Sequence, residues 1–314
     1  MARYILRRLA FLALTLVLTS LLIFVITQLL PGDVCRVILG REVGEAASQA
    51  CRAELRLDDP ALVRYGDWLS GFLRGDMGLS YSTDAEIGPL VAERLGNSLM
   101  LAGFTLAIAV PLATGLGALA ALNEGKWLDN LISVFSLAVV GLPEFVTGIV
   151  LIELLAFRVG LPANSSIRPG TGFFEALPSL ILPALTATLV LLAYIARLTR
   201  AGVLEELKQP YVRTAALKGL PRWVVILRHV LRNALAPTIT VVAISFGWLI
   251  SGLVVIENVF NYPGLGRLMV FAISRRDLPL LQGVAMVTVL AFALANLGAD
   301  LLYAALNPRI RVGE

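Results

Sequence analysis

Long stretches without Asp, Glu, Lys or Arg dominate this sequence. Five of them are found at residues 9–32, 95–123, 176–196, 233–256 and 278–299. Each is long enough to cross a bilayer as a helix, which takes about 20 mostly apolar residues. A sixth run, residues 131–157, is apolar except for Glu144 and Glu153. The pattern predicts an all-α integral membrane protein with six transmembrane helices, of which the third is the least regular.

The composition favours the same interpretation. Charged residues make up 15% of the 314 residues, whereas soluble domains carry about 25%. Buried core helices of a large soluble protein are the alternative for any one run, but five runs in one chain argue against it. The first run follows Arg3, Arg7 and Arg8 like a signal peptide. It is longer than the apolar region of 7–15 residues in such a peptide and lacks a cleavage site, so we expect a retained helix.

The distribution of basic residues predicts the orientation of the spans. Short cytoplasmic loops collect Lys and Arg. Three segments are rich in them, namely the N-terminus, the segment between the fourth and fifth spans, and the C-terminus. Their basic residues are Arg3, Arg7, Arg8, Arg197, Arg200, Lys208, Arg213, Lys218, Arg222, Arg228, Arg232, Arg309 and Arg311. An even number of spans places all three segments on one side, so both termini are predicted to be cytoplasmic.

Residues 33–94 then form a small outer cap between the first two spans. This segment has eleven Asp or Glu against seven Arg, and long loops cross membranes largely regardless of charge. Within it, apolar side chains recur at helical spacing, so we expect one or more short helices. These residues are Leu62, Tyr65, Leu69 and Phe72.

Both cysteines, Cys35 and Cys51, fall in the cap. An oxidising compartment would allow them to pair. A disulfide closing a loop of about 15 residues is worth roughly 3 kcal/mol in the chain-entropy model. Two unrelated free thiols are the alternative.

Residues 197–234, between the fourth and fifth spans, are too long and too basic for a turn. Pro210 can begin a helix at its first position, and residues 211–217 favour helix. Gly219 followed by Pro221 is a stop signal. Residues 222–235 then place apolar side chains among arginines, which predicts a second, amphipathic helix that leads into the fifth span.

A positive-inside anchor with Arg side chains reaching lipid headgroups would explain this charge. It would not explain the small residues Ala215, Ala216 and Gly219 before a sharp break. Small residues let another protein surface approach closely, so we predict that the short helix docks a soluble partner and passes force to the spans. The predicted docking residues are Tyr211, Arg213, Thr214, Ala215, Ala216, Lys218, Gly219, Leu220 and Pro221.

Two runs in this segment, YVRTAALKGL (211–220) and LRHVLRNALAP (227–237), resemble the cytoplasmic loop of binding-protein-dependent ABC importer permeases. In the wider family this loop carries Glu-Ala-Ala, three residues, then Gly. Gly219 stands at the Gly position here, and Arg213 replaces the Glu. The later Leu-Pro of the general pattern is Leu231-Arg232. Both departures resemble the dipeptide/oligopeptide/nickel branch rather than the sugar branch.

Further runs along nearly the whole chain resemble the same branch. They are YILRR (4–8), LPGD (30–33), LDDP (57–60), RGDMGLS (74–80), ENVFNYPGLG (257–266), and DL (300–301) with NPR (307–309).

The resemblance implies partners. A second, related permease subunit, expected to form a heterodimer, would pair with this chain in the bacterial cytoplasmic (inner) membrane. Two cytoplasmic ABC ATPases, which carry ATP and Mg²⁺, would dock on residues 211–221, and an external solute-binding protein would deliver the solute. Short peptides are the leading solute class; nickel chelates, glutathione, opines and oligosaccharides remain open.

The outer loop before the last span is the expected contact for the binding protein or the solute. Its composition also predicts a structured turn, and a mere connector is the alternative. The residues are Asn261, Tyr262, Pro263, Gly264, Leu265 and Gly266.

The chain itself is not expected to be an enzyme. A P-loop needs G-x-x-x-x-G-K-[ST] to hold phosphates. The one Gly-Lys pair, Gly125-Lys126, is followed by Trp127, and Ala120 stands where the first Gly should be. One His and two Cys leave little for a metal site, and a net charge of +4 is weak as a sign of nucleic-acid binding. We therefore expect no cofactor, no metal and no nucleic acid on this chain.

A self-contained, proton-coupled transporter is the rival hypothesis. Acidic residues inside a bilayer often mark ion paths, and Glu144 and Glu153 are the candidates. They are nine residues apart, about 2.5 helical turns, and so would not face the same way. Pro143 is expected to kink the span. The absence of a detectable inverted repeat also disfavours this class.

Overall fold

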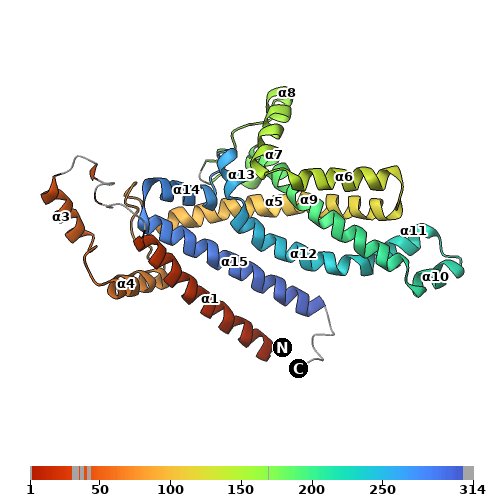
Figure 1. The fold of residues 1–314 in the computed structure, drawn as a ribbon, viewed down its shortest axis with the longest axis horizontal. Coiled ribbons are helices and arrows are strands. Elements are labelled where there is room, and N and C mark those ends of the chain that lie inside the picture. The colour runs from red at the N-terminus through yellow and green to blue at the C-terminus, as the bar shows by residue number, and fades with distance from the viewer. Residues whose placement is uncertain (1, 30–34, 36–38, 41–43, 169, 307–314) are drawn as a thin grey trace. The chain divides into compact units, whose positions relative to one another are not determined.

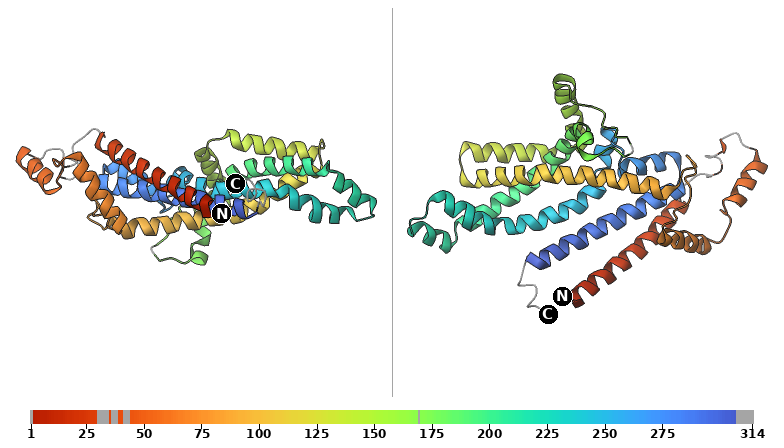
Figure 2. Two further views of the ribbon diagram at one scale, coloured as in Figure 1. Left: turned by 90° about the horizontal axis from the view of Figure 1, so that it is seen from below. Right: turned by 180° about the vertical axis from the view of Figure 1, so that it is seen from behind.

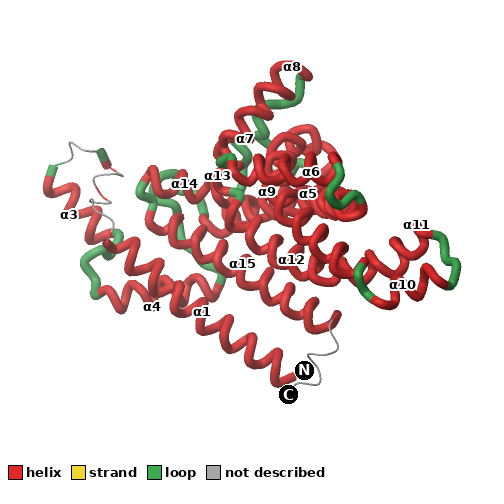
Figure 3. Tube along the Cα trace, turned by 45° about the vertical axis from the view of Figure 1, so that its right-hand side comes forward, coloured by secondary structure: helices red, strands yellow, loops and turns green. Residues whose placement is uncertain are grey.

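The computed structural model describes residues 2–29, 35, 39–40, 44–168 and 170–306, and this part of the chain is helical apart from its loops (Figure 3). One isolated antiparallel bridge joins Leu79 and Glu86. The chain divides into two compact units. The first comprises Met1–Ser98 with Pro263–Leu294, and the second comprises Leu99–Tyr262 with Ala295–Glu314.

Within the described residues, four helices are long and apolar enough to cross a membrane. They are α1 (Ala2–Leu29), α5 (Ile87–Leu122), α9 (Phe173–Leu207) and α15 (Leu278–Leu306). A bent pair of helices is a fifth if it counts as one span. At the predicted fifth span lies α12 (Leu231–Gly252), followed by α13 (Val254–Val259). The chain is thus a multi-pass membrane protein, while the count of six spans and the side of the termini stay predictions.

The third predicted span is broken rather than kinked. It consists of α6 (Trp127–Gly141), α7 (Glu144–Leu151), the π-helix η1 (Ile152–Ala156) and α8 (Phe157–Val159). The two parts are bent by 109° (Figures 1 and 2). Leu142 is extended, with φ −94° and ψ 133°, because Pro143 disfavours a helical residue before it. The sequence predicted the position of this irregularity but not its size.

Small residues bring the long helices of the second unit into close contact. A Cβ atom on Gly117 of α5 would lie 2.4 Å from the carbonyl oxygen of Ala196 in α9. A Cβ on Gly202 of α9 would lie 2.9 Å from the carbonyl oxygen of Ala234 in α12. Leu180, Ile195 and other buried side chains of this unit form its largest apolar cluster.

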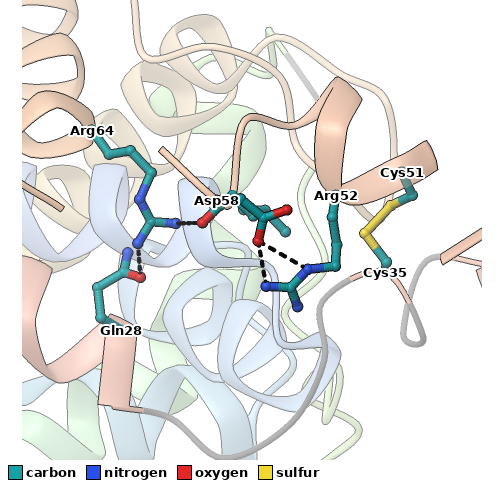
Figure 4. Close-up of polar contacts among 7 residues, drawn as sticks. Gln28, Cys35, Cys51, Arg52, Asp58 and Arg64 are labelled. Carbon is teal, nitrogen blue, oxygen red and sulfur yellow. Dashed lines mark hydrogen bonds and ion pairs between the residues drawn. A yellow bond between two sulfur atoms is a disulfide. The ribbon is translucent and has the colours of Figure 1, made fainter. Parts of the chain in front are cut away.

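In the first unit, the cap is built from α3 (Glu45–Glu54) and α4 (Ala61–Arg74). A disulfide links Cys35 to Cys51, with Cα atoms 5.9 Å apart (Figure 4). Arg52 forms an ion pair with Asp58 at 2.7 Å, and Arg64 donates to the side chain of Gln28 in α1.

The helix predicted at residues 61–73 is present, with a shifted apolar face. Tyr65 and Trp68 pack against Phe24 of α1, and the hydroxyls of Tyr65 and Ser20 lie 2.8 Å apart. Leu62, however, is 83% exposed. The cap is therefore seated on the end of α1 by aromatic side chains.

A buried carboxylate anchors the loop after the cap to the last long helix. Asp277 accepts hydrogen bonds from the hydroxyls of Ser80 and Ser82, at 2.6 and 2.8 Å. Its other oxygen accepts the backbone N–H of Leu280 and so caps α15. Next to it, α14 (Leu265–Arg275) packs on Ile87 of α5 and the start of α15.

Gly117→Ala should destabilise the protein by about 1–3 kcal/mol, the usual cost of overpacking. The added methyl group would collide with the α9 backbone. The matched control is Gly115→Ala, because a Cβ at this nearby α5 position meets no atom within 4 Å. Thermal unfolding in detergent measures the difference. Equal midpoints for the two variants would contradict the close packing of α5 on α9.

Candidate functional site

A short helix lies at one end of α9 and α12, as the sequence predicted. This helix, α10 (Pro210–Leu217), begins with Pro210 at its first turn. After its last residue, Leu217, the chain leaves the helix at Gly219, whose φ is +75°. The N–H groups of Gly219 and Leu220 donate to the carbonyl oxygens of Ala216 and Ala215, at 3.0 and 3.4 Å. This arrangement satisfies the last carbonyls and needs a left-handed residue, which Gly provides without strain.

The inner face of α10 packs against its own chain. Ala215 is buried in an apolar cluster with Val203 of α9 and Val230 of the π-helix η2 (Val225–Val230). The one-turn helix α11 (Arg222–Val224) leads into η2. Because Ala215 is buried, it holds α10 in place and does not offer a surface to a partner.

Tyr211 joins α10 to the ends of two long helices. Its hydroxyl donates to the carboxylate of Glu206 in α9 and accepts from the side-chain amide of Asn233 in α12 at 3.1 Å. The pKa of this hydroxyl is raised, mainly by burial and to a smaller extent by its hydrogen bond to Glu206. Tyr211, predicted as a docking residue, is therefore mainly an internal link.

The outer face of α10 and the following turn are exposed. Of the predicted docking residues, those that are exposed are Arg213, Thr214, Ala216, Lys218, Gly219, Leu220 and Pro221. The sequence interpretation missed Leu217 and Trp223, which are 80% and 66% exposed. The available signal was the spacing of Leu217 four residues after Arg213, which places both on one helical face. We call Arg213, Leu217, Lys218, Leu220 and Trp223 the outer α10 face.

A partly buried ion pair ties the first turn of α6 to α9, with Asp129 buried and the Arg200 side chain 30% exposed. The guanidinium group of Arg200 donates to both carboxylate oxygens of Asp129, at 2.6 and 2.7 Å. Asp129 also accepts the backbone N–H of Gly125 at 3.0 Å. A bidentate pair of this kind fixes geometry as well as charge. The sequence predicted only a role in orientation for Arg200, although Asp129, the one charged residue of the apolar segment 127–141, was a signal that it needs a basic partner.

The predicted outer contact is largely buried. Asn261 is exposed, whereas Tyr262 to Gly266 are buried. Asn261 ends α13 with φ +54°, and the N–H of Tyr262 donates to the carbonyl oxygen of Glu257 at 2.8 Å. The carbonyl of Phe260 accepts the N–H of Ser165 at 2.8 Å.

In the first unit, the second half of this loop is bonded to the end of α5 before residue 99. The side chain of Asn97 donates to the carbonyl oxygen of Pro263, and the hydroxyl of Ser98 accepts the N–H of Leu265, both at 2.9 Å. The loop is thus a structured turn held by its own chain, and Asn261 is the residue of the six that offers exposed surface.

Glu144 and Glu153 do not share a site. Glu144 is partly buried at the start of α7 and lines a pocket of about 510 Å³. Glu153 is exposed on η1 and does not line this pocket. Within the described residues, no group of three or more His, Cys, Asp or Glu side chains is placed to hold a metal ion.

Two family descriptions match this chain. Residues 113–312 match "Binding-protein-dependent transport system inner membrane component", and residues 1–102 match the N-terminal part of such membrane components. A probable peptide ABC transporter permease, y4tP of Sinorhizobium fredii (strain NBRC 101917 / NGR234), is 37% identical over 99% of this chain and 100% of its own length. The glutathione transport system permease GsiC of Escherichia coli (strain K12) is 35% identical over 99% of each chain.

Among solved structures, a chain of an amino acid ABC transporter crystallised with histidines is similar, with a TM-score of 0.54 and 16% identity. The match covers 69% of this chain and 94% of that one. At this identity the likeness shows the fold alone.

Asp129→Ala should destabilise the protein by about 1–3 kcal/mol, because it leaves the mostly buried guanidinium of Arg200 without its acceptor. Removing both charges in Asp129→Ala with Arg200→Met should recover part of this loss. Lys126→Ala, at an exposed neighbouring position, is the control. Thermal unfolding of the wild type, Asp129→Ala, Arg200→Met, the double variant and the control measures the coupling, and a double variant whose loss equals the sum of the two single losses would contradict it.

Proposed function

Because the chain belongs to the family of binding-protein-dependent transport system inner membrane components, we propose that it is one of two permease subunits of an ATP-driven importer. The importer would carry di- or oligopeptides, or similar small solutes, across the bacterial inner membrane. The relatives named for peptide and glutathione transport support this solute class.

The outer α10 face carries the proposal. Apolar Leu217 and Trp223 stand exposed beside the basic Arg213 and Lys218 at the end of a helical bundle. Exposed aromatic and aliphatic side chains together with Arg are the usual anchors of a protein interface. We propose that a cytoplasmic ABC ATPase, which binds ATP and Mg²⁺, docks here, with a second one on the partner permease.

A continuous set of contacts in the second unit can carry motion away from this surface. Tyr211 links α10 to Glu206 of α9 and Asn233 of α12. Arg200 of α9 then grips Asp129 of α6. A push on α10 would therefore move α9, α12 and α6 together, and α6 leads directly to the break at Pro143.

Of the six residues predicted as the outer contact, we propose that Asn261 contacts the solute-binding protein, because its side chain is exposed. The remaining residues of the predicted contact support the turn from inside. The rival proton-coupled transporter gains no support, because Glu144 and Glu153 do not share a site and the similar proteins are ABC permeases.

Purification of the tagged chain in mild detergent should recover a second multi-span subunit and P-loop ATPases, identified by mass spectrometry. The physical reason is that the outer α10 face is exposed and contains its own anchor residues. A chain that purifies alone and transports under a proton gradient without ATP would overturn the importer proposal.

Substitutions in the outer α10 face and at Gly219 should weaken docking of the ATPase while membrane insertion of the chain persists. Arg213→Glu and Leu217→Asp should each lower ATP-driven uptake by about ten-fold or more, the effect expected of a central interface residue. Gly219→Trp should do the same, because φ +75° is strained for any side chain. Arg158→Glu, which reverses an exposed charge on α8, is the matched control and should retain uptake. Normal uptake by all three variants would exclude this docking site.

A further inference from the structure

A pocket of about 510 Å³ lies beside the break in the third span. Three parts of the second unit line it: the α6–α7 junction, the middle of α9, and α12. Its lining residues are Val139, Val140, Leu142, Pro143, Glu144, Val190, Leu191, Tyr194, Val241, Ile244, Ser245 and Trp248. This volume and this largely apolar wall with few polar groups are typical of small-ligand sites.

The predicted orientation puts Lys126, just before α6, at the cytoplasmic surface of the membrane. The helix α6 has 15 residues, so it is about 22 Å long, which is less than the roughly 30 Å of hydrocarbon that a span must cross. With Lys126 at the surface, the extended backbone at Leu142 would fall inside the bilayer. Irregular backbone at that depth is tolerated where it lines a cavity or is buried in protein. Leu142 and Pro143 do line the pocket.

Glu144 is the one ionisable carboxylate of this wall. The twelve described lining residues include no Lys, Arg or His. A carboxylate inside a membrane is costly, usually pairs with a positively charged group, and often marks a functional site. The two aromatic residues of the wall, Tyr194 and Trp248, are exposed in this chain, and aromatic faces also attract cations. A positively charged ligand group would thus satisfy both kinds of lining residue.

On the basis of the importer function proposed above, we propose that this pocket binds the transported solute through its ammonium group, with Glu144 as the counter-ion. Trp248 and Tyr194 would provide the ring faces beside it, and the aliphatic wall of α9 and α12 would accept the apolar part of the solute. A short peptide with a free amino terminus fits this description.

The site also explains how the break could serve transport. Discontinuous helices with half-helix ends at a central ligand are a recurring design of transporters. Here the same junction that holds Glu144 is joined to α6, and α6 is tied to α9 by the Asp129–Arg200 pair. Motion of α9 driven from α10 would therefore change the pocket that α9 itself lines.

A binding measurement on the membrane complex alone distinguishes selectivity of this pocket from selectivity of the solute-binding protein. The membrane complex of both permeases and both ATPases would be placed in nanodiscs without the solute-binding protein. It would be titrated with radiolabelled Leu-Leu and with its N-acetyl form. The wild-type complex should bind the free amine about ten-fold more tightly or better, since hydrogen bonds to charged groups are strong. Glu144→Gln should lose this preference while retaining the acetylated peptide. The matched control is Glu153→Gln, which removes an exposed carboxylate of the same broken span and should keep the preference.

A second variant guards against a folding defect in Glu144→Gln. Trp248→Leu keeps the carboxylate and an apolar wall, and should weaken binding of the free amine more than binding of the acetylated peptide. A wild-type complex without a preference for the amine, or a Glu144→Gln complex that keeps it, would overturn the site. A lipid acyl chain or a helix of the second permease filling the pocket would give the first of these results. Failure of the wild-type complex to import any peptide with ATP and binding protein would instead refute the proposed function.

Discussion

The interior of a bilayer offers no hydrogen-bond partner to a free backbone group, and this constraint shapes the rest of the structure. It accounts for helices as long as α5 and α9, because a helix pairs its own backbone groups except opposite an internal proline, here Pro111, Pro178 and Pro183. It also makes any interruption costly unless something else is gained. The break at Leu142 and Pro143 is therefore an informative position, because it coincides with a pocket and with the carboxylate of Glu144. Long helices thus surround the break between α6 and α7.

Close backbone contact packs the long helices of the second unit tightly against one another. Gly117 and Gly202 remove the side chains that would otherwise separate α9 from α5 and α12. Small residues at helix crossings are the usual source of tight packing in membranes, where apolar burial between helices contributes little. The Asp129–Arg200 pair adds a directional link to α6. A displacement at α10 can thus reach the broken span as movement of packed helices, with no flexible loop between them.

Much of this architecture could be predicted from the sequence, because charge-free runs and punctuation residues act locally. The runs located the long helices, Pro210 and Gly219 placed α10, and Pro143 marked the irregular span. What local patterns could not predict was which neighbour each face would meet. Ala215 was expected at a partner's surface but is buried on the inner face of α10. Leu217, which was not among the predicted docking residues, is exposed. Likewise, α9 continues to Leu207 through residues expected in the cytoplasmic loop.

Some residues of the runs that carry the family resemblance set the shape of the chain rather than offer a surface. Gly219 and Asn261 belong to two of these runs, and both follow a helix in the left-handed conformation, with φ of +75° and +54°. Tyr262 to Gly266 are buried around the second of these turns. Such residues preserve the shape of the chain, whatever it transports. Any selectivity of this chain would come from side chains that the fold leaves within reach of a ligand, and Glu144, Tyr194 and Trp248 line one pocket beside the broken span.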